Sequence, residues 1–233
     1  MRSQPPLLLI AHRGASAVAP EGTRAALRAA VRARAGMIEL DVQMTREGRL
    51  IAFHDDRLDR TTDGAGPVAS RRYAHLARLD AGRWFHRRFA GERILLVSQA
   101  LRLVPRGMRV NLELKPTRRR AALLGRLLRV VRRSPGGKRR LLLSSFDPAL
   151  IRPLRRRGFA VALITRREPE RALRTAIRLG CASWHPFRVL ATPRRIARAQ
   201  AAGLRVYAWT VEAPREARRL FRLGVDGVFT NDP

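Results

Sequence analysis

The feature that most constrains the fold is an alternation of short apolar runs, typical of strands, with longer arginine-rich amphipathic segments, typical of helices. Strands are predicted at residues 6–11, 37–43, 108–114, 140–145, 159–164, 181–185, 204–210 and 226–230. Helices are predicted between most of them, at residues 22–35, 117–133, 148–157, 168–179, 192–202 and 214–223. Glycines lie at the junctions, where helix C-termini prefer them. Eight strands joined by helical crossovers predict an α/β fold with a (β/α)8 TIM barrel.

One apolar run, residues 49–53, breaks this alternation. Only residues 45–48 separate it from strand 37–43, which is too short for a parallel crossover, so we expect an antiparallel hairpin. The stretch 55–96 that follows is rich in turn residues and aromatics, and an insertion of this length over a barrel mouth is usually functional. No second core large enough for another domain stands out, so we expect a single domain over residues 1–233.

The chain is extremely basic, with a formal net charge of +31, and all but two of its 49 basic residues are arginine. The arginines are spread along the predicted helices rather than gathered in a tail. We interpret most of them as solvated helix faces, with codon bias as one source of the skew and attraction to an anionic surface or substrate as another. No nucleic-acid recognition motif accompanies the charge, so no nucleic-acid partner is expected.

Cysteine usage and hydropathy indicate the compartment. Cys181 is the only cysteine, so no disulfide framework can form, and a reducing compartment fits. Its apolar neighbours predict a packed core thiol. We find no signal peptide and no apolar stretch of the ~20 residues that a membrane helix needs. We therefore expect a cytoplasmic protein with at most peripheral contact with anionic membranes.

Three carboxylates stand at predicted strand ends. Glu39 and Asp41 are two positions apart on one strand and so point the same way, and Glu113 is the matching residue of the next main strand. Taken singly, each has a structural interpretation as the partner of an arginine. Together at one end of a barrel they would repel one another unless a cation held them. Their hard oxygen ligands favour Mg²⁺ or Ca²⁺ over zinc.

Two of the five histidines follow apolar runs at predicted strand ends. His12 and His54 can serve as a general acid and a general base near neutral pH, although a histidine in either place also fits a satisfied core or rim position. His75, His86 and His185 are predicted to lie on the surface or in the insertion.

Positive charge and an aromatic wall complete the predicted site. Arg13 can hold phosphate oxygens bidentately, and Lys115 supplies a compact charge in a chain that otherwise uses arginine. Trp209, at the end of strand 204–210, is interpreted as a pocket wall, with core packing as the alternative. A cation, two basic side chains and two histidines together indicate phosphoryl transfer.

These residues resemble the glycerophosphodiester phosphodiesterase family over nearly the whole chain. Residues 12–23 resemble its His-Arg-Gly and Pro-Glu-Asn-Thr segments, residues 39–55 its Glu-x-Asp and His-Asp segments, residues 58–62, 80–82 and 84–85 its insertion, residues 111–115 its third strand, and residues 208–211 and 224–227 its closing strands. The ordered set is far more specific than any one of its motifs. The resemblance implies a TIM barrel of the phospholipase-C-like phosphodiesterase type, with a small insertion after strand two.

The resemblance also implies an activity and residue roles. It implies metal-dependent hydrolysis of a small glycerophosphodiester to sn-glycerol 3-phosphate and an alcohol, through a cyclic phosphate, in glycerol and lipid metabolism. The implied roles are acid and base for His12 and His54, one Mg²⁺ or Ca²⁺ on Glu39, Asp41 and Glu113, and phosphate contacts from Arg13 and Lys115. One departure is Gly22 in place of the family's asparagine, which is expected to loosen the start of the first helix because glycine offers no side-chain cap.

Two other functions fit parts of the sequence. A lysophospholipase D on the same barrel would use the same residues on a lipid substrate, with the basic charge facing a membrane. A non-catalytic basic module would bind nucleic acid or anionic lipid with a steep salt dependence and no need for Glu39 or Glu113.

Overall fold

Eight parallel strands close into a barrel in the computed structural model, which describes residues 8–233. In chain order the barrel strands are β1 (Leu8–Ala11), β2 (Met37–Met44), β4 (Arg109–Leu114), β5 (Leu141–Ser145), β6 (Ala160–Thr165), β7 (Ser183–Pro186), β8 (Arg205–Ala208) and β9 (Gly227–Thr230). The pairing of β1 with both β2 and β9 closes the ring. The predicted barrel is therefore confirmed, and the part of the first predicted strand before residue 8 lies outside the described residues.

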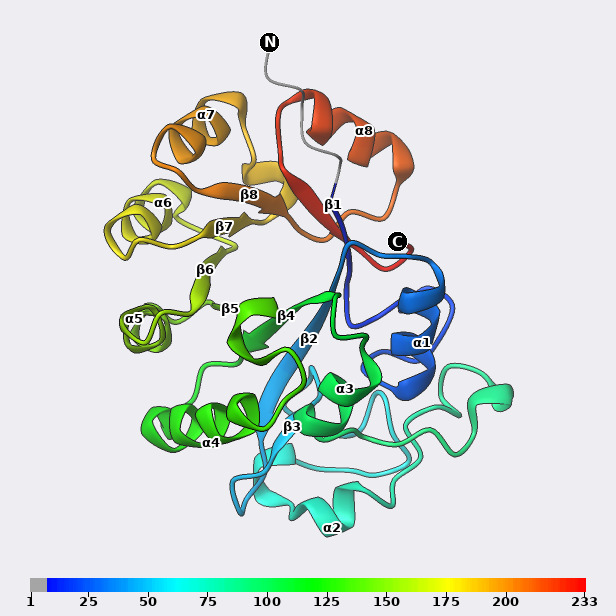
Figure 1. Cartoon of the computed structure of the whole chain (residues 1–233). Coiled ribbons are helices and arrows are strands. Elements are labelled where there is room, and N and C mark those ends of the chain that lie inside the picture. The colour runs from blue at the N-terminus through cyan, green and yellow to red at the C-terminus, as the bar shows by residue number, and fades with distance from the viewer. Residues whose placement is uncertain (1–7) are drawn as a thin grey trace.

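Helices join the strands and form the outer layer of the barrel (Figure 1). They are α1 (Arg24–Arg32), α3 (Val97–Leu103), α4 (Arg120–Arg132), α5 (Pro148–Arg156), α6 (Pro169–Arg178), α7 (Pro193–Ala201) and α8 (Pro214–Arg222). The expected weak start of the first helix is wrong. Thr23 caps α1 by accepting from the Ala26 amide, and Gly22 instead supplies a turn with φ 71° before the cap.

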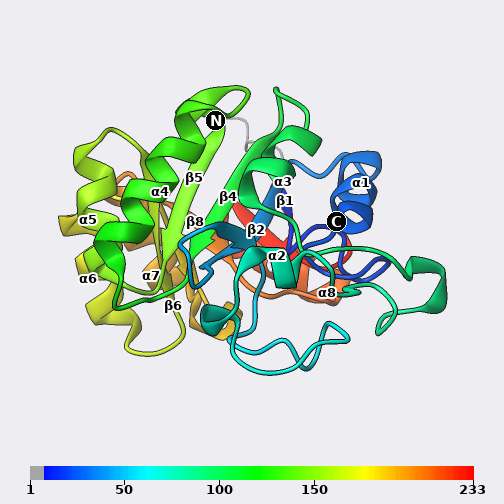
Figure 2. The ribbon, with the colours of Figure 1, turned by 90° about the horizontal axis from the view of Figure 1, so that it is seen from below.

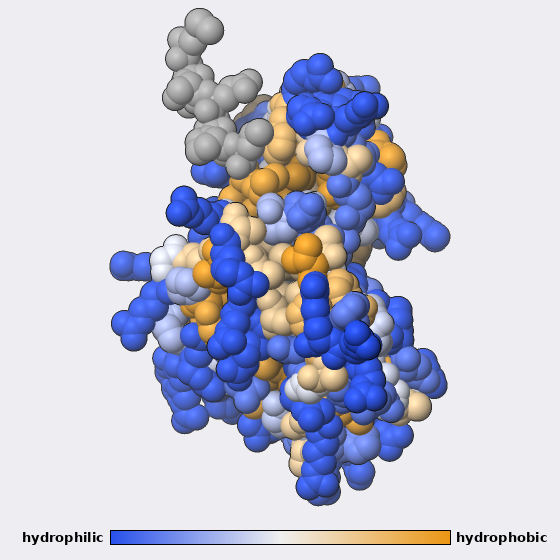
Figure 3. Space-filling model, turned by 90° about the vertical axis from the view of Figure 1, so that its right-hand side faces the viewer, coloured by the Kyte–Doolittle hydropathy of each residue, from blue (hydrophilic) through white to orange (hydrophobic). Residues whose placement is uncertain are grey.

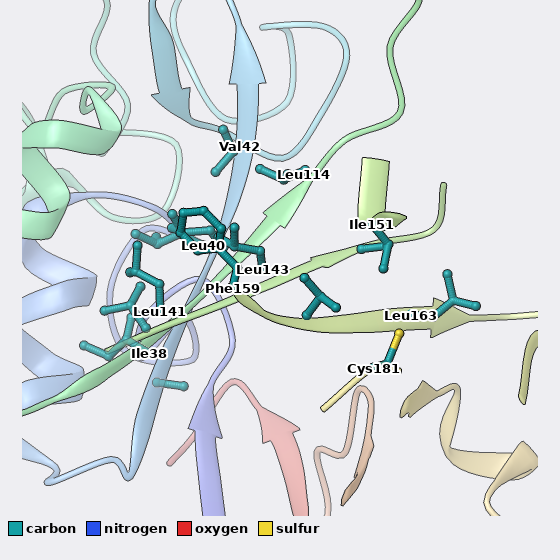
Figure 4. Packing of buried hydrophobic residues seen from close by; sticks show 14 of the residues in the cluster. Ile38, Leu40, Val42, Leu114, Leu141, Leu143, Ile151, Phe159, Leu163 and Cys181 are labelled. Atoms are coloured by element: carbon teal, nitrogen blue, oxygen red, sulfur yellow. The ribbon is translucent and has the colours of Figure 1, made fainter. Parts of the chain in front are cut away.

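The main core lies between the barrel strands and these helices (Figure 4). Alternate residues of β2, Ile38, Leu40 and Val42, pack outward into this layer with Leu112 of β4. Side chains of a strand alternate between its faces, so the residues between these apolar ones face the barrel interior. This alternation places the carboxylates of β2 and β4 inside the barrel. Cys181 is buried in the same layer, as predicted.

The run after β2 forms the expected hairpin. The short strand β3 (Leu50–Ala52) pairs antiparallel with β2, with Val42 opposite Ala52. The Phe53 amide then donates to the Asp41 carbonyl, which brings His54 back over the barrel mouth.

Residues 55–96 carry three short helical turns, η1 (Val68–Ser70), α2 (Tyr73–Leu76) and η2 (Arg87–Phe89). In Figure 2 the loops of this segment extend from the barrel beside α2. A small second cluster, which includes Ile51, Leu58, Val68 and Leu76, holds the segment against β3.

The face shown in Figure 3 is mostly hydrophilic, with apolar residues exposed between the polar ones. Within residues 8–233, no helix combines the length and the apolar character of a membrane span.

Candidate active site

The three predicted carboxylates converge inside the barrel. Asp41 and Glu113 are direct neighbours in the register of β2 with β4, and Glu39 lies two residues before Asp41 on the same face. One carboxylate oxygen of each lies within 4.8 Å of the others. Glu39 and Asp41 are only 2% and 4% exposed, so their charges are shielded from water.

The two predicted phosphate ligands pair with these carboxylates in this structure. The Lys115 ammonium donates to Glu113 Oε1 at 2.8 Å and lies 2.7 Å from Asp41 Oδ1. Arg13 Nε lies 3.2 Å from Asp41 Oδ2, as an ion pair without hydrogen-bond geometry. Two cations thus face three carboxylates, which leaves the cluster one positive charge short of neutrality.

The excess of carboxylates over cations shifts the pKa values of the three carboxyl groups. Burial raises the pKa of Glu39 well above its usual value, and the charges of Asp41 and Glu113 raise it further. Burial and Asp41 likewise raise the pKa of Glu113. Burial opposes ionisation of Asp41 as well, but Lys115 and Arg13 outweigh it and hold its pKa below the usual range. The cluster therefore has affinity for a further positive charge.

The unpartnered oxygens of the site fit a hard divalent cation. Glu39 Oε1, Asp41 Oδ2 and Asn111 Oδ1 are buried and accept no hydrogen bond. Buried acceptors without donors are costly, and carboxylate and amide oxygens are the ligands that Mg²⁺ and Ca²⁺ prefer. Asn111 was not among the predicted site residues. The signal for it was its place two residues before Glu113, on the same face of β4.

A tight turn after β1 fixes Arg13. Arg13 has φ 57° and Gly14 has φ 83°, and the turn lets the Arg13 amide donate to Glu39 Oε2 at 2.9 Å. A Cβ on Gly14 would meet the Ala26 backbone at 2.7 Å, so only glycine fits between β1 and α1.

His12 is oriented by a side chain from the far end of the chain. Its Nδ1 lies 2.8 Å from Asn231 Oδ1, and the Asn231 amide group donates to Glu212. Because Glu212 takes the amide hydrogen, the Asn231 oxygen faces His12, and Nδ1 carries the proton. Nε2 is then the free, basic nitrogen. Burial, with help from Arg13, lowers the pKa of His12 to about 4, so the ring is neutral at pH 7.

His54 is oriented by a carboxylate instead of an amide. Its Nδ1 lies 2.5 Å from Asp55 Oδ1, and Arg60 holds Asp55 from the insertion. Burial is the largest single influence and raises the pKa of Asp55, but the bonds to Arg60 and His54 and their charges together outweigh it and bring the pKa down to about 2. Arg60 also bonds Glu21, which links the insertion to the loop after β1. Asp55, Arg60 and Asn231 were not predicted as site residues.

Both histidines, the three carboxylates and Lys115 line one cavity of about 170 Å³. Trp209 forms part of its wall, as predicted, with its indole N–H donating to the His185 carbonyl. The rings of Phe146 and Phe187 pack edge-on against Trp209. Two histidines, a carboxylate cluster that could hold a cation and a partly apolar wall thus share one concave space, the usual setting of an active site.

The predicted surface position of His185 is wrong. His185 is 1% exposed and faces the barrel interior, with Nε2 2.9 Å from Ser183 Oγ and its ring against Tyr207 and Phe229. It alternates with Trp184, which packs outward into the core. Burial lowers the pKa of His185 to about 3.

This buried histidine predicts sensitivity to acid. The unfolded chain binds a proton at His185 below about pH 6.5 and the folded chain does not, so stability falls as the pH drops from there toward 3. Between pH 7 and pH 5 we expect the free energy of unfolding to fall by about 2 kcal/mol more in the native protein than in His185→Gln. Urea unfolding at both pH values measures the difference. An equal fall in the free energy of unfolding in the two proteins would show that groups other than His185 cause the acid sensitivity.

The chain is similar to known proteins in both sequence and structure. Residues 12–233 match the model of the glycerophosphoryl diester phosphodiesterase family. The chain is 32% identical to a glycerophosphodiester phosphodiesterase of Caldanaerobacter subterraneus, over 97% of this chain and 94% of the relative. It is 33% identical to a putative glycerophosphodiester phosphodiesterase of Bacillus subtilis, over 97% and 95%. Among solved structures, an Oleispira antarctica phosphodiesterase in complex with the product sn-glycerol-3-phosphate superposes with a TM-score of 0.91 and 31% identity, over 98% of this chain and 94% of that one.

Proposed function

Since the chain belongs to the glycerophosphoryl diester phosphodiesterase family and is a glycerophosphodiester phosphodiesterase, we propose that it cleaves its substrates by paired histidine catalysis beside a divalent cation. The products are sn-glycerol 3-phosphate and an alcohol. One observation carries the proposal: two histidines with free Nε2 atoms share a cavity with a buried carboxylate cluster that lacks one positive charge.

The reaction needs two proton transfers in each half. The glycerol hydroxyl next to the phosphorylated carbon attacks phosphorus, and one histidine takes its proton. The other histidine protonates the leaving alcohol oxygen as the P–O bond breaks, which leaves a cyclic phosphate. Water then opens the ring with the two histidines in exchanged roles, and the enzyme returns to its first protonation state.

The partners of the two histidines favour one order of roles. The Asp55 carboxylate stabilises a positively charged His54, so His54 is the better initial acid for the leaving alcohol. Asn231 is neutral and gives no such support to a charged His12. Because His12 is neutral at pH 7 with a free Nε2, it is the better initial base.

Glu39, Asp41 and Glu113 would hold the cation, and the unpartnered oxygen of Asn111, which lines the same cavity, would be a fourth ligand. When bound, Mg²⁺ or Ca²⁺ supplies Lewis-acid neutralisation of the charge that develops on the phosphoryl oxygens. Lys115 has three N–H donors and directs two of them at carboxylates, which leaves one for a phosphate oxygen. Arg13 adds a second positive charge at the same place.

Three further expectations go with this activity. We propose that residues 1–233 act as one catalytic domain in glycerol and lipid metabolism, with residues 55–96 as an insertion that positions His54 through Arg60. The free, buried thiol of Cys181 supports a reducing, cytoplasmic compartment. The exposed arginines would limit any membrane contact to the surface of anionic lipid, and no nucleic-acid partner is proposed.

A substrate without the attacking hydroxyl tests the cyclic route. We expect a 2-deoxy analogue of glycerophosphoethanolamine to bind but not to turn over, while the natural diester gives a transient cyclic phosphate signal in ³¹P NMR. Comparable turnover of both diesters would show direct attack by water and would contradict the proposed route.

A further inference from the structure

A groove that the reaction described above does not use adjoins the catalytic cavity. The groove has a volume of about 570 Å³ and lies over the ends of β5 and β6 and the start of α6. It shares Phe146, Ile164 and Arg166 with the catalytic cavity. On the opposite side of the site, the space lined by Glu21 and Thr61 is only about 20 Å³, little more than one water molecule. A leaving alcohol that outgrows the cavity therefore extends into the groove.

The groove carries an excess of positive charge. Its charged lining residues are Arg166, Arg167, Glu168 and Arg171. Glu168 is paired with Arg171 at 3.2 Å. Arg166 and Arg167 have no carboxylate within salt-bridge distance among residues 8–233, and Arg166 stands where the groove joins the catalytic cavity.

Arginine guanidinium groups already lie over one aromatic ring beside this junction. A free aromatic face would suit a quaternary ammonium group, and the Phe187 ring, which packs against Trp209 of the cavity wall, is the nearest candidate. The guanidinium groups of Arg188 and Arg166 instead lie over the Phe187 ring, 4.9 Å and 5.8 Å from its centre. Arg188 is paired with Glu216 at 2.9 Å, whereas Arg166 has no such partner among residues 8–233, so the charge of Arg166 would repel an ammonium group placed beside this ring.

We propose that this groove is the binding site of the leaving alcohol, and that Arg166 selects alcohols with a negatively charged oxygen group, a carboxylate or a phosphate. The inference rests on the proposed function, because it takes the alcohol to leave from the cavity that holds His12 and His54. Arg166 is a specificity residue. Its planar guanidinium can bind either group through paired N–H donors.

Two substrates that differ in one carboxylate test the preference. Glycerophosphoserine and glycerophosphoethanolamine both carry an ammonium group, and only the serine compound adds a carboxylate. We expect kcat/KM to be about fivefold higher for the serine diester, the scale of one partly exposed charge pair. In Arg166→Gln the ratio should fall to near one. A glycerophosphoglycerol with and without a terminal phosphate repeats the comparison and shows which anionic group Arg166 prefers.

Arg174→Gln is the matched control. It removes the same charge from the exposed face of α6, outside the lining of the groove. The serine preference should survive in this variant. An equal loss of the serine preference in both variants would show that the net positive charge of the protein causes it, and would overturn the role of Arg166.

The remaining outcomes separate this inference from the proposed function. Turnover of the diesters with equal kcat/KM, or with a preference for glycerophosphocholine, would overturn the selection of anionic alcohols and leave the phosphodiesterase mechanism standing. Failure to release glycerol 3-phosphate from any diester would instead refute the proposed function on which the inference rests.

Discussion

Replacement of His54 by alanine is expected to lower kcat for glycerophosphodiester hydrolysis by about 10²- to 10⁴-fold, the usual range for loss of a general acid or base. His54 reaches the cavity at the end of the β2–β3 hairpin and is 34% exposed. Removal of this side chain therefore takes away little packing and is expected to leave the fold intact. His12→Ala is expected to lose activity on the same scale, because each half of the reaction needs one proton donor and one acceptor. Steady-state release of glycerol 3-phosphate from glycerophosphoethanolamine measures both effects.

His75→Ala is the control for these two substitutions. His75 is exposed on α2, away from the catalytic cavity, so its removal should leave kcat unchanged. Circular dichroism of each variant separates loss of chemistry from loss of fold. Wild-type turnover in His12→Ala or His54→Ala would remove that histidine from the mechanism.

Glu39→Gln is expected to raise the stability of the metal-free protein and to lower its activity. Its carboxylate is buried beside Asp41 and Glu113, and burial together with these two charges raises its pKa, so the site disfavours the ionised form of Glu39. A carboxyl whose pKa is raised in the folded state lowers the free energy of unfolding as the pH rises above the pKa that the group has in the unfolded chain. Glutamine removes this loss of stability. The glutamine oxygen can still accept from the Arg13 amide. Without metal, the variant should therefore be more stable than the native protein by about 1 kcal/mol.

The same substitution removes a ligand from the cation site. We expect kcat to fall about a hundredfold or more, and the rise in Tm that Mg²⁺ or Ca²⁺ gives the native protein to disappear. Glu170→Gln, on the exposed face of α6, should keep both the activity and the metal-induced rise in Tm. A Glu39→Gln variant that melts higher with metal, as the native protein does, would place the cation elsewhere.

The sequence predicts the parts of the site that follow from strand geometry. Glu39 and Asp41 alternate with leucine and valine on β2, so their common direction is fixed once the strand is recognised. The distance between β2 and β3 along the chain allows only a hairpin, which returns His54 to the site.

The missed contacts depend on long-range arrangement that no local pattern encodes. Asn231 lies 219 residues from His12 along the chain, and the two meet only because β9 closes the barrel against β1. Arg60 reaches Asp55 from an irregular loop, where neither helical nor strand periodicity applies. The surface position predicted for His185 is wrong because no local pattern shows which way its side chain points, and only the closed barrel turns it inward.

The most direct test of the account is metal-dependent product release by the native protein. We would measure glycerol 3-phosphate from glycerophosphoethanolamine after treatment with EDTA, and again after addition of Mg²⁺ or Ca²⁺. The account predicts no product in EDTA and recovery with one of the two ions. Full activity in EDTA would contradict a catalytic cation on Glu39, Asp41 and Glu113.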